Sequence, residues 1–460
     1  MLTLLGFGMV VTFMVLIMTK RLSPMVALIV VPLIFAIVGG FGDERLGPMM
    51  LEGIRTLAPT GVMLMFAILY FGVMIDAGLF DPIVRYILAL VGGDPMKVVV
   101  GTAVLAAAVS LDGDGSTTYM ITVASMLPLY RRLGMSALSL TCVTMLASGV
   151  MNLTPWGGPL ARVASALQVD PSEVFVPMIP AMIAGIIGVF GLAYYLGIRE
   201  RRRLPHLQLG PHAFADPSPR AQKVGLGPDG SIRDVVGSGD AAGVPADPQE
   251  DLRRPRLLWV NAALTTALMT GLIANILPLP VLFMIGFAVA LVINYPRVEE
   301  QRRRVAEHAQ NVIAVVSLIF AAGIFTGILS GTGMVDAMSR SFLAAIPDEY
   351  GPYLAPITAL ASLPFTFFIS NDAFYFGIMP IIAEAGAEYG ISHAEMARAS
   401  LIGQPVHLLS PLVPSTYLLA GLAGVDFADH QRFCLKWAVM ICMILMAAGL
   451  LLGLFPWVTG

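Results

Sequence analysis

The chain has 460 residues, of which 57% are hydrophobic and 12% are charged, and its formal net charge is −3. Soluble domains carry about 25% charged residues, so this composition excludes an ordinary soluble domain and indicates a polytopic membrane protein. The sequence has no glycine-rich nucleotide loop, HExxH or nucleophile elbow, so we expect neither an enzyme nor an ATP-driven pump, and no nucleic-acid partner. The three cysteines, Cys142, Cys434 and Cys442, are predicted to be buried thiols.

In the first half, apolar segments predict membrane crossings at about 2–19, 24–42, 57–79, 136–151 and 174–198. The region 98–129 is different, because two short apolar arms flank the polar run Ser110–Thr118. A spanning helix needs ~20 residues, so neither arm crosses alone. We predict a re-entrant hairpin, since irregular backbone inside a membrane must face protein or a water-filled cavity.

Residues 199–256 interrupt the apolar pattern with Pro, Gly, Asp and Arg, which predicts a flexible linker. This linker separates a first transmembrane repeat, 1–198, from a second, 257–460. In the second half, we predict a hairpin over 353–386 and crossings at about 257–277, 279–295, 311–332, 396–424 and 434–457.

The two halves share motifs at a nearly constant spacing. Gly78-Leu79-Phe80-Asp81 is followed 255 positions later by Gly333-Met334-Val335-Asp336. Leu133-Gly134-Met135-Ser136 is followed 256 positions later by Tyr389-Gly390-Ile391-Ser392. Each half holds five crossings and one hairpin, and an odd number of crossings inverts the second half. We therefore expect an all-α polytopic fold with an inverted-topology repeat and discontinuous helices.

Charge predicts the orientation of this fold. Basic residues gather on the linker side, including Arg131, Arg199 to Arg203, Arg253 to Arg256 and Arg297 to Arg304, whereas acidic residues dominate the other side. By the positive-inside rule, the linker is cytoplasmic and both termini are external. The first hairpin then enters from the cytoplasm and the second from outside.

The tip of the first hairpin holds two carboxylates, Asp112 and Asp114, with the hydroxyls of Ser116 and Thr117. Charged groups at bilayer depth are costly and are functional by default, so we interpret the aspartates as a metal or proton site. The glycines beside them allow backbone N–H groups to approach an anion. Such a tip suits a carboxylate that carries a divalent cation. The competing interpretation is that the aspartates are helix caps.

The segment 152–159 predicts a broken helix, because two prolines and two glycines fall within it. Asn152, Thr154, Gly157 and Gly158 are candidate substrate-binding residues there. Arg162 follows one turn later and could pair with a substrate carboxylate. Alternatively, Arg162 extends to a membrane interface without a ligand.

In the second half, Ser370-Asn371-Asp372 forms the tip of the hairpin. Ser370 and Asn371 can donate to carboxylates, and Asp372 is either another metal or proton site or a helix cap. His407, the only histidine within a predicted crossing, is a candidate proton relay, with a hydrogen-bonded packing role as the alternative. The hydroxyl residues of the second broken helix are Ser410, Ser415 and Thr416.

Several of these motifs resemble one family. The segments are MTKRLS at 18–23, LDGDGSTTYM at 111–120, LPLY at 127–130 and PWGGP at 155–159 followed by Ala161-Arg162. They resemble the citrate–metal:proton symporters of the CitMHS family, which belong to the ion transporter superfamily. The resemblance covers the chain outside 205–255.

This resemblance implies uptake of citrate complexed with Mg²⁺ or Ca²⁺, driven by protons, with the metal as part of the substrate and no permanently bound cofactor. The superfamily fold implies a homodimer in the cell membrane, with a scaffold domain and a transport domain that moves like an elevator. Sodium-coupled carboxylate carriers of the superfamily have Ser-Asn-Thr tips. Here Asp372 follows Ser370-Asn371, which suits a metal-bearing substrate. The alternatives are a cation/proton antiporter and a symporter of free di- or tricarboxylates.

Overall fold

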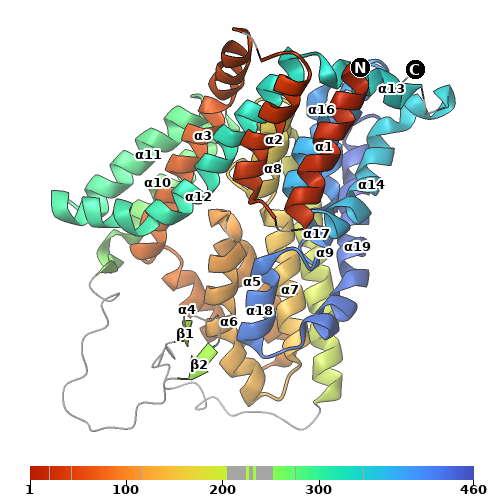
Figure 1. Cartoon of the computed structure of the whole chain (residues 1–460). Coiled ribbons are helices and arrows are strands. Elements are labelled where there is room, and N and C mark those ends of the chain that lie inside the picture. The colour runs from red at the N-terminus through yellow and green to blue at the C-terminus, as the bar shows by residue number, and fades with distance from the viewer. Residues whose placement is uncertain are drawn as a thin grey trace.

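The computed structural model describes residues 1–19, 21–42, 44–113, 115–204, 224–226, 232–234, 252–274, 276–344 and 347–459. These residues form helices almost throughout (Figure 1). The exception is an antiparallel pair of short strands, β1 (Val224–Leu226) and β2 (Ile232–Asp234). Within the described ranges, six helical segments are long and apolar enough to cross a membrane: Leu46–Asp76, Pro95–Asp112, Pro171–Arg203, Pro255–Ile273, Val298–Gly331 and Phe427–Leu451.

The first half contains nine α-helices among its described residues. They are α1 (Leu2–Met18), α2 (Pro24–Val38), α3 (Leu46–Asp76), α4 (Asp81–Val91), α5 (Pro95–Val109), α6 (Gly115–Arg132), α7 (Ala137–Met151), α8 (Gly158–Ala166) and α9 (Pro171–Arg203). A 3₁₀ turn, Ser110–Asp112, follows α5 directly.

The second half contains ten α-helices among its described residues. Its helices are α10 (Leu258–Ile273), α11 (Leu279–Asn294), α12 (Val298–Gly331), α13 (Met334–Leu343), α14 (Leu354–Phe368), α15 (Met379–Ala387), α16 (His393–Ser400), α17 (Gln404–His407), α18 (Pro414–Ala423) and α19 (Phe427–Leu451). A π-helical segment, Ala373–Ile378, lies between α14 and α15. Such segments are frequent at functional sites.

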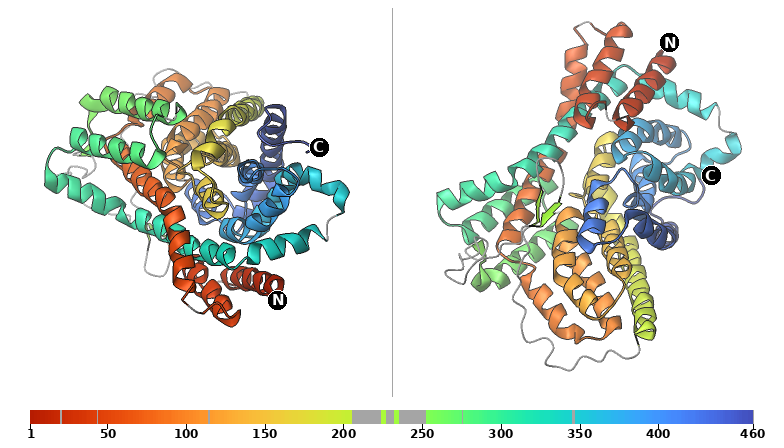
Figure 2. Two further views of the ribbon diagram at one scale, coloured as in Figure 1. Left: turned by 90° about the horizontal axis from the view of Figure 1, so that it is seen from above. Right: turned by 60° about the horizontal axis from the view of Figure 1, so that its bottom comes forward.

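Two long helices, α3 from the first half and α12 from the second, pack tightly against each other (Figure 2). Glycines make this close approach possible. A Cβ atom at Gly53 would overlap the carbonyl oxygen of Gly323, and one at Gly327 would overlap the carbonyl oxygen of Met49. Small residues at a crossing allow helix backbones in membranes to touch, so dispersion contacts between the two backbones stabilise this part of the crossing.

The outer ends of α5 and α6 lie together beside the last turns of α9. Asp94, which caps α5, pairs with Arg201 at 3.8 Å. The Arg203 guanidinium donates to the carbonyl of Gly134, just after α6, at 2.8 Å. The helix–turn–helix unit α5–α6 therefore has both outer ends at one end of the molecule, with the polar tip pointing into it.

The outer ends of α14 and α15 lie at the other end. The backbone N–H of Thr459 donates to the carbonyl of Pro352, before α14, at 3.1 Å. Gly351 packs against the ring of Tyr389, just after α15. Both termini lie at this end of the molecule, at the top of Figure 1. The two helical hairpins therefore approach the middle from opposite directions.

Three helices extend beyond their predicted ranges. The crossings predicted at 57–79 and 311–332 correspond to α3 and α12, which both begin earlier, and α9 continues to Arg203. The turns added to α9 and α12 are rich in Glu, Gln and Arg, which are good helix formers. Acidic residues in the first turn of α12 and arginines in the last turn of α9 also complement the helix dipoles.

A buried ionic cluster joins α3 to α12. One oxygen of Asp76 contacts Arg304 Nη1 at 3.0 Å and His308 Nε2 at 2.9 Å. The His308 ring lies flat against Gly72, where a side chain would collide with it.

The prediction that His407 is the only histidine in a crossing is wrong, because α19 begins at Phe427 and buries His430 completely.

Candidate functional site

The first hairpin and the first broken helix meet at Trp156. Its indole N–H donates to the carbonyl of Leu111 at 2.9 Å. Gly113 has φ of +77°, and a Cβ atom there would lie 2.7 Å from the Trp156 ring. Only glycine fits this left-handed turn under an aromatic ring. Asp112 is buried beside the turn, and Ser116 and Thr117 lie in the first turn of α6.

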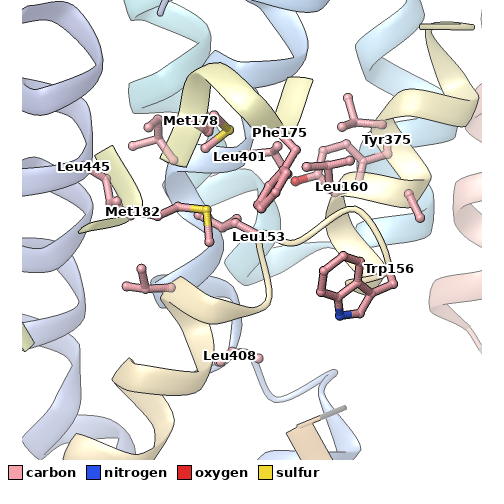
Figure 3. Packing of buried hydrophobic residues seen from close by; sticks show 14 of the residues in the cluster. Leu153, Trp156, Leu160, Phe175, Met178, Met182, Tyr375, Leu401, Leu408 and Leu445 are labelled. Carbon is pink, nitrogen blue, oxygen red and sulfur yellow. The ribbon is translucent and has the colours of Figure 1, made fainter. Parts of the chain in front are cut away.

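Trp156 also joins the tip to the long helices behind it. Its ring lies 5.4 Å from Phe71 of α3 and 5.1 Å from Phe283 of α11, between ring centroids. Figure 3 shows Leu153 and Trp156 on the loop that connects α7 to α8, close to Leu160. This apolar packing supports the polar side of the loop and limits its movement.

The first broken helix holds Arg162 in place through two glycines. A Cβ atom at Gly157 would overlap the carbonyl oxygen of Asn152, so the loop closes tightly on itself. A Cβ atom at Gly158 would lie 2.6 Å from Nη1 of Arg162. The guanidinium therefore folds back over α8, and both predicted glycines have a steric role.

The central contact of the site joins the two halves. Nε of Arg162 donates to Oδ1 of Asp372 at 2.6 Å, across 210 positions of sequence. The side chains are 25% and 14% exposed, respectively. Arg162 therefore does not simply extend to an interface, and Asp372 does more than cap a helix. The pair places a cation from the first broken helix on an anion from the second hairpin tip.

A second polar contact fixes the hairpin tip of the second half. The side-chain amides of Asn371 and Gln404 exchange two hydrogen bonds of 3.3 Å. Gln404 also donates to the hydroxyl of Tyr375 at 2.7 Å. Ser370 Oγ accepts from the backbone N–H of Ala373 at 3.2 Å. These bonds orient the tip toward α17, which belongs to the second broken helix.

His407 and the hydroxyls that follow it lie on this second break. Nδ1 of His407 lies 2.6 Å from the carbonyl of Thr366, near the end of α14, so His407 is held by a hydrogen bond in packed surroundings. Ser410 Oγ accepts from the N–H of Leu412 at 3.2 Å, and Thr416 donates to the carbonyl of Leu408. Ser410 and Thr416 thus stabilise the unwound backbone.

Two buried oxygen atoms at the break between α7 and α8 have no hydrogen-bond partner. They are Oδ1 of Asn152 and Oγ1 of Thr154. Buried polar atoms are almost always paired, so orphaned ones need a reason such as a ligand or a water. Both residues were predicted as substrate-binding residues from the sequence.

The structure brings the predicted segments together by direct contacts. Trp156 joins the first broken helix to the first hairpin tip, and Arg162 joins the same broken helix to the second hairpin tip. A Cβ atom added at Gly115, in the first tip, would lie 3.7 Å from Ser415 Oγ of the second broken helix. Asp114 lies outside the described residues. Among the described residues, the site included, no three His, Cys, Asp or Glu side chains are grouped to hold a metal.

Three residues that are not among the candidate substrate-, metal- or proton-binding residues prove central to the geometry. They are Trp156, Tyr375 and Gln404. The sequence could have indicated the role of Trp156, because a large aromatic residue stands between glycines and prolines in the PWGGP motif. Tyr375 and Gln404 lie in apolar runs, and their partnership depends on packing between helices.

Fold and site together define a helical, multi-span membrane transporter. The fold is similar to that of the Alcanivorax borkumensis YdaH transporter, with a TM-score of 0.55, 14% identity and 90% of each chain covered. It is also similar to that of Neisseria gonorrhoeae MtrF, with a TM-score of 0.55, 14% identity and coverage of 88% of this chain and 83% of that one. At this identity the likeness concerns the fold alone.

The chain belongs to the CitMHS family, whose profile, described as "Citrate transporter", matches residues 13–403. It is 58% identical over 454 residues to a "Citrate transporter" of Bacillus subtilis (strain 168), covering 99% of each chain. It is 49% identical over 453 residues to the "Mg(2+)/citrate complex secondary transporter" of the same organism, covering 98% of this chain and 99% of that one. The resemblance seen in the sequence is therefore confirmed, as is the expectation of a secondary transporter for citrate rather than an enzyme.

Proposed function

We propose that this protein imports citrate complexed with a divalent cation, Mg²⁺ or Ca²⁺, in symport with protons across the cell membrane. The observation that carries the proposal is the Arg162–Asp372 pair at 2.6 Å where the broken segments converge. A cation and an anion side by side match a substrate that presents a carboxylate and a metal ion. The 49% identical relative described as a Mg²⁺/citrate transporter supports the same substrate class.

In this proposal, a citrate carboxylate takes the place of Asp372 on the Arg162 guanidinium. Guanidinium binds carboxylates in a bidentate manner, so this exchange is specific as well as strong. Asp372, once released, contacts the metal of the complex or takes up a proton. Substrate binding and proton binding are then coupled through Asp372.

The remaining candidates surround this exchange. The orphaned oxygens of Asn152 and Thr154 receive substrate hydroxyl groups or metal-bound water. The carboxylates of Asp112 and Asp114 contribute oxygen ligands of the kind that hard divalent cations prefer. Asn371 and Ser370 contact the substrate from the second tip, and the hydroxyls of the second break contact it from the other side: Ser410, Ser415 and Thr416.

The proposal includes an inverted-topology repeat. Corresponding left-handed glycines support it, with φ of +83° at Gly78 and +71° at Gly333. Asp170 and Asp426 also cap α9 and α19 in the same way. With the basic ends of α6 and α9 facing the cytoplasm, the linker is cytoplasmic and both termini are external. The first hairpin then opens to the cytoplasm and the second to the outside.

We further propose that the protein acts as a homodimer with elevator-type movement. In this scheme, the glycine-packed pair of α3 and α12 belongs to the scaffold, and the hairpins and broken helices form the transport domain. Trp156, which packs against Phe71 and Phe283 of the long helices, lies where the two domains slide past each other.

Thermal unfolding of the purified protein tests the substrate class, because a ligand that binds only the folded state raises the melting temperature. We expect stabilisation by citrate with Mg²⁺ or Ca²⁺ and little by either component alone. Stabilisation by citrate in the presence of a chelator would favour a free tricarboxylate symporter. Stabilisation by the metal ion alone would favour a cation/proton antiporter.

A further inference from the structure

A large apolar cavity lies away from the proposed transport site. Its volume is about 590 Å³, which is within the usual range for ligand pockets. One wall is formed by α1 and another by α14, and a third is formed at the start of α15 and just before it. Val10, Ala361 and Ile381 represent these three walls. The cavity therefore lies between the second hairpin and the first helix, beside the place where Gly377 packs against Val10.

One buried polar residue lies in the wall of this apolar cavity. Thr358 lines the cavity, is only 2% exposed, and its hydroxyl oxygen has no hydrogen-bond partner. A buried hydroxyl without a partner costs free energy. The remaining walls are aliphatic or aromatic side chains, so an occupant needs a long apolar part and a single hydrogen-bond acceptor.

The depth of Thr358 identifies the kind of acceptor. Thr358 lies four residues after Leu354, the first residue of α14, which is about 6 Å along the helix axis. Tyr350, which is 55% exposed, lies at the rim of the cavity just before α14. Tyrosines concentrate at the level of lipid headgroups. The Thr358 hydroxyl therefore lies at the depth of the phospholipid ester groups, one level deeper in the membrane than the headgroups.

The surroundings of the cavity are apolar. Ile357 and Phe365 line the cavity and are also largely exposed, and Leu360, between them on α14, is 47% exposed. In a membrane, these side chains contact lipid chains. An apolar cavity does not hold ordered water, so in a bilayer it is filled by the hydrocarbon next to it.

We propose that this cavity is a specific phospholipid site. One acyl chain fills the space between α1, α14 and α15, and its ester carbonyl accepts a hydrogen bond from Thr358. Tyr350 lies beside the headgroup. The acyl chain replaces side-chain packing between the first helix and the second hairpin, so the two surfaces separate without exposing an apolar gap.

Native mass spectrometry of the delipidated full-length protein tests this proposal, with palmitoyl-oleoyl phosphatidylglycerol as the probe. Wild type should bind one lipid at lower concentration than all further lipids. Ala361→Trp fills the cavity and should weaken this binding at least tenfold, whereas Leu360→Trp, on the lipid-facing side of the same turn, should leave it unchanged. Thr358→Val removes one hydrogen bond and should weaken binding roughly fivefold.

Melting temperatures of the two tryptophan variants provide the folding control. Equal lipid binding by Ala361→Trp and Leu360→Trp would overturn the proposal, as would a wild type that shows no saturable first lipid. Wild-type binding by Thr358→Val would overturn the placement of the ester group.

Discussion

Replacement of Arg162 by glutamine removes the cation at the centre of the proposed site and keeps a polar side chain of similar length. Asp372 then loses its partner at 2.6 Å, and the substrate loses its guanidinium. We expect the variant to fold and to reach the membrane, because the pair lies at a junction of loops and helix ends. We expect citrate uptake to fail at ordinary substrate concentrations.

The size of the effect follows from the burial of the pair. Breaking a buried ion pair costs ~3–5 kcal/mol, whereas an exposed pair is worth about 0–1 kcal/mol. Side-chain exposures of 25% and 14% place this pair between the two cases. A loss of about 2 kcal/mol in substrate binding corresponds to a roughly thirtyfold increase in KM. Arg162→Lys keeps the charge but not the bidentate geometry, so we expect an intermediate value.

The assay is initial-rate uptake of labelled citrate with Mg²⁺ into proteoliposomes. Arg55→Gln is the matched control, because Arg55 pairs with Glu52 at 3.7 Å with exposures of 68% and 73%. Its KM should equal that of wild type. The double variant Arg162→Gln/Asp372→Asn should lose less than the sum of the two single variants, since both remove one interaction. A wild-type KM for Arg162→Gln would refute the assigned role.

Four further variants test separate parts of the account. Gly113→Ala should abolish uptake while the protein still folds, because a side chain at φ of +77° would collide with the indole ring at 2.7 Å; wild-type uptake would contradict the tip geometry. Gly53→Ala should lower the melting temperature, at a cost of roughly 1–3 kcal/mol from overpacking, whereas Gly47→Ala, on the same helix with no atom within 4 Å, should not. Gln404→Ala should raise KM at least fivefold, since it removes the hydrogen bonds to Asn371 and Tyr375, each of about 1 kcal/mol, that orient the second tip; a change in melting temperature alone would point to packing only. Asp114→Asn should abolish proton-coupled uptake in a folded protein, and full activity would remove this carboxylate from the metal or proton site.

Breaks in the helices could be predicted from local sequence. The polar runs around Asp112 and Asp372 interrupt apolar stretches, and prolines and glycines mark the other two breaks. The structure has helix ends at these positions: α5 ends at Val109, α14 at Phe368 and α7 at Met151. Such signals are local, because they depend on which residues the chain can place in a helix inside an apolar environment.

Partnerships across the chain could not be predicted in this way. Arg162 and Asp372 are 210 positions apart, and Asn371 meets Gln404 only because α17 packs beside the second tip. Asp76 likewise receives hydrogen bonds from Arg304 and His308 of the other half. Sequence periodicity shows which face of a helix is apolar but not which other helix covers it.

The lengths of the long helices were also underestimated. Hydropathy ends a predicted crossing where charged residues begin, although charged residues such as those at 299–304 continue a helix well beyond the membrane. The apolar cavity between α1 and α14 could not be predicted from the sequence, because its walls come from three separate segments of the chain.

Uptake of labelled citrate into proteoliposomes with an inward proton gradient tests the central proposal most directly. Parallel reactions contain Mg²⁺, Ca²⁺ or a chelator, with and without a protonophore. We predict uptake that requires a divalent cation and collapses when the protonophore dissipates the gradient. Uptake that persists in the chelator would contradict metal–citrate symport and would make the free anion the substrate.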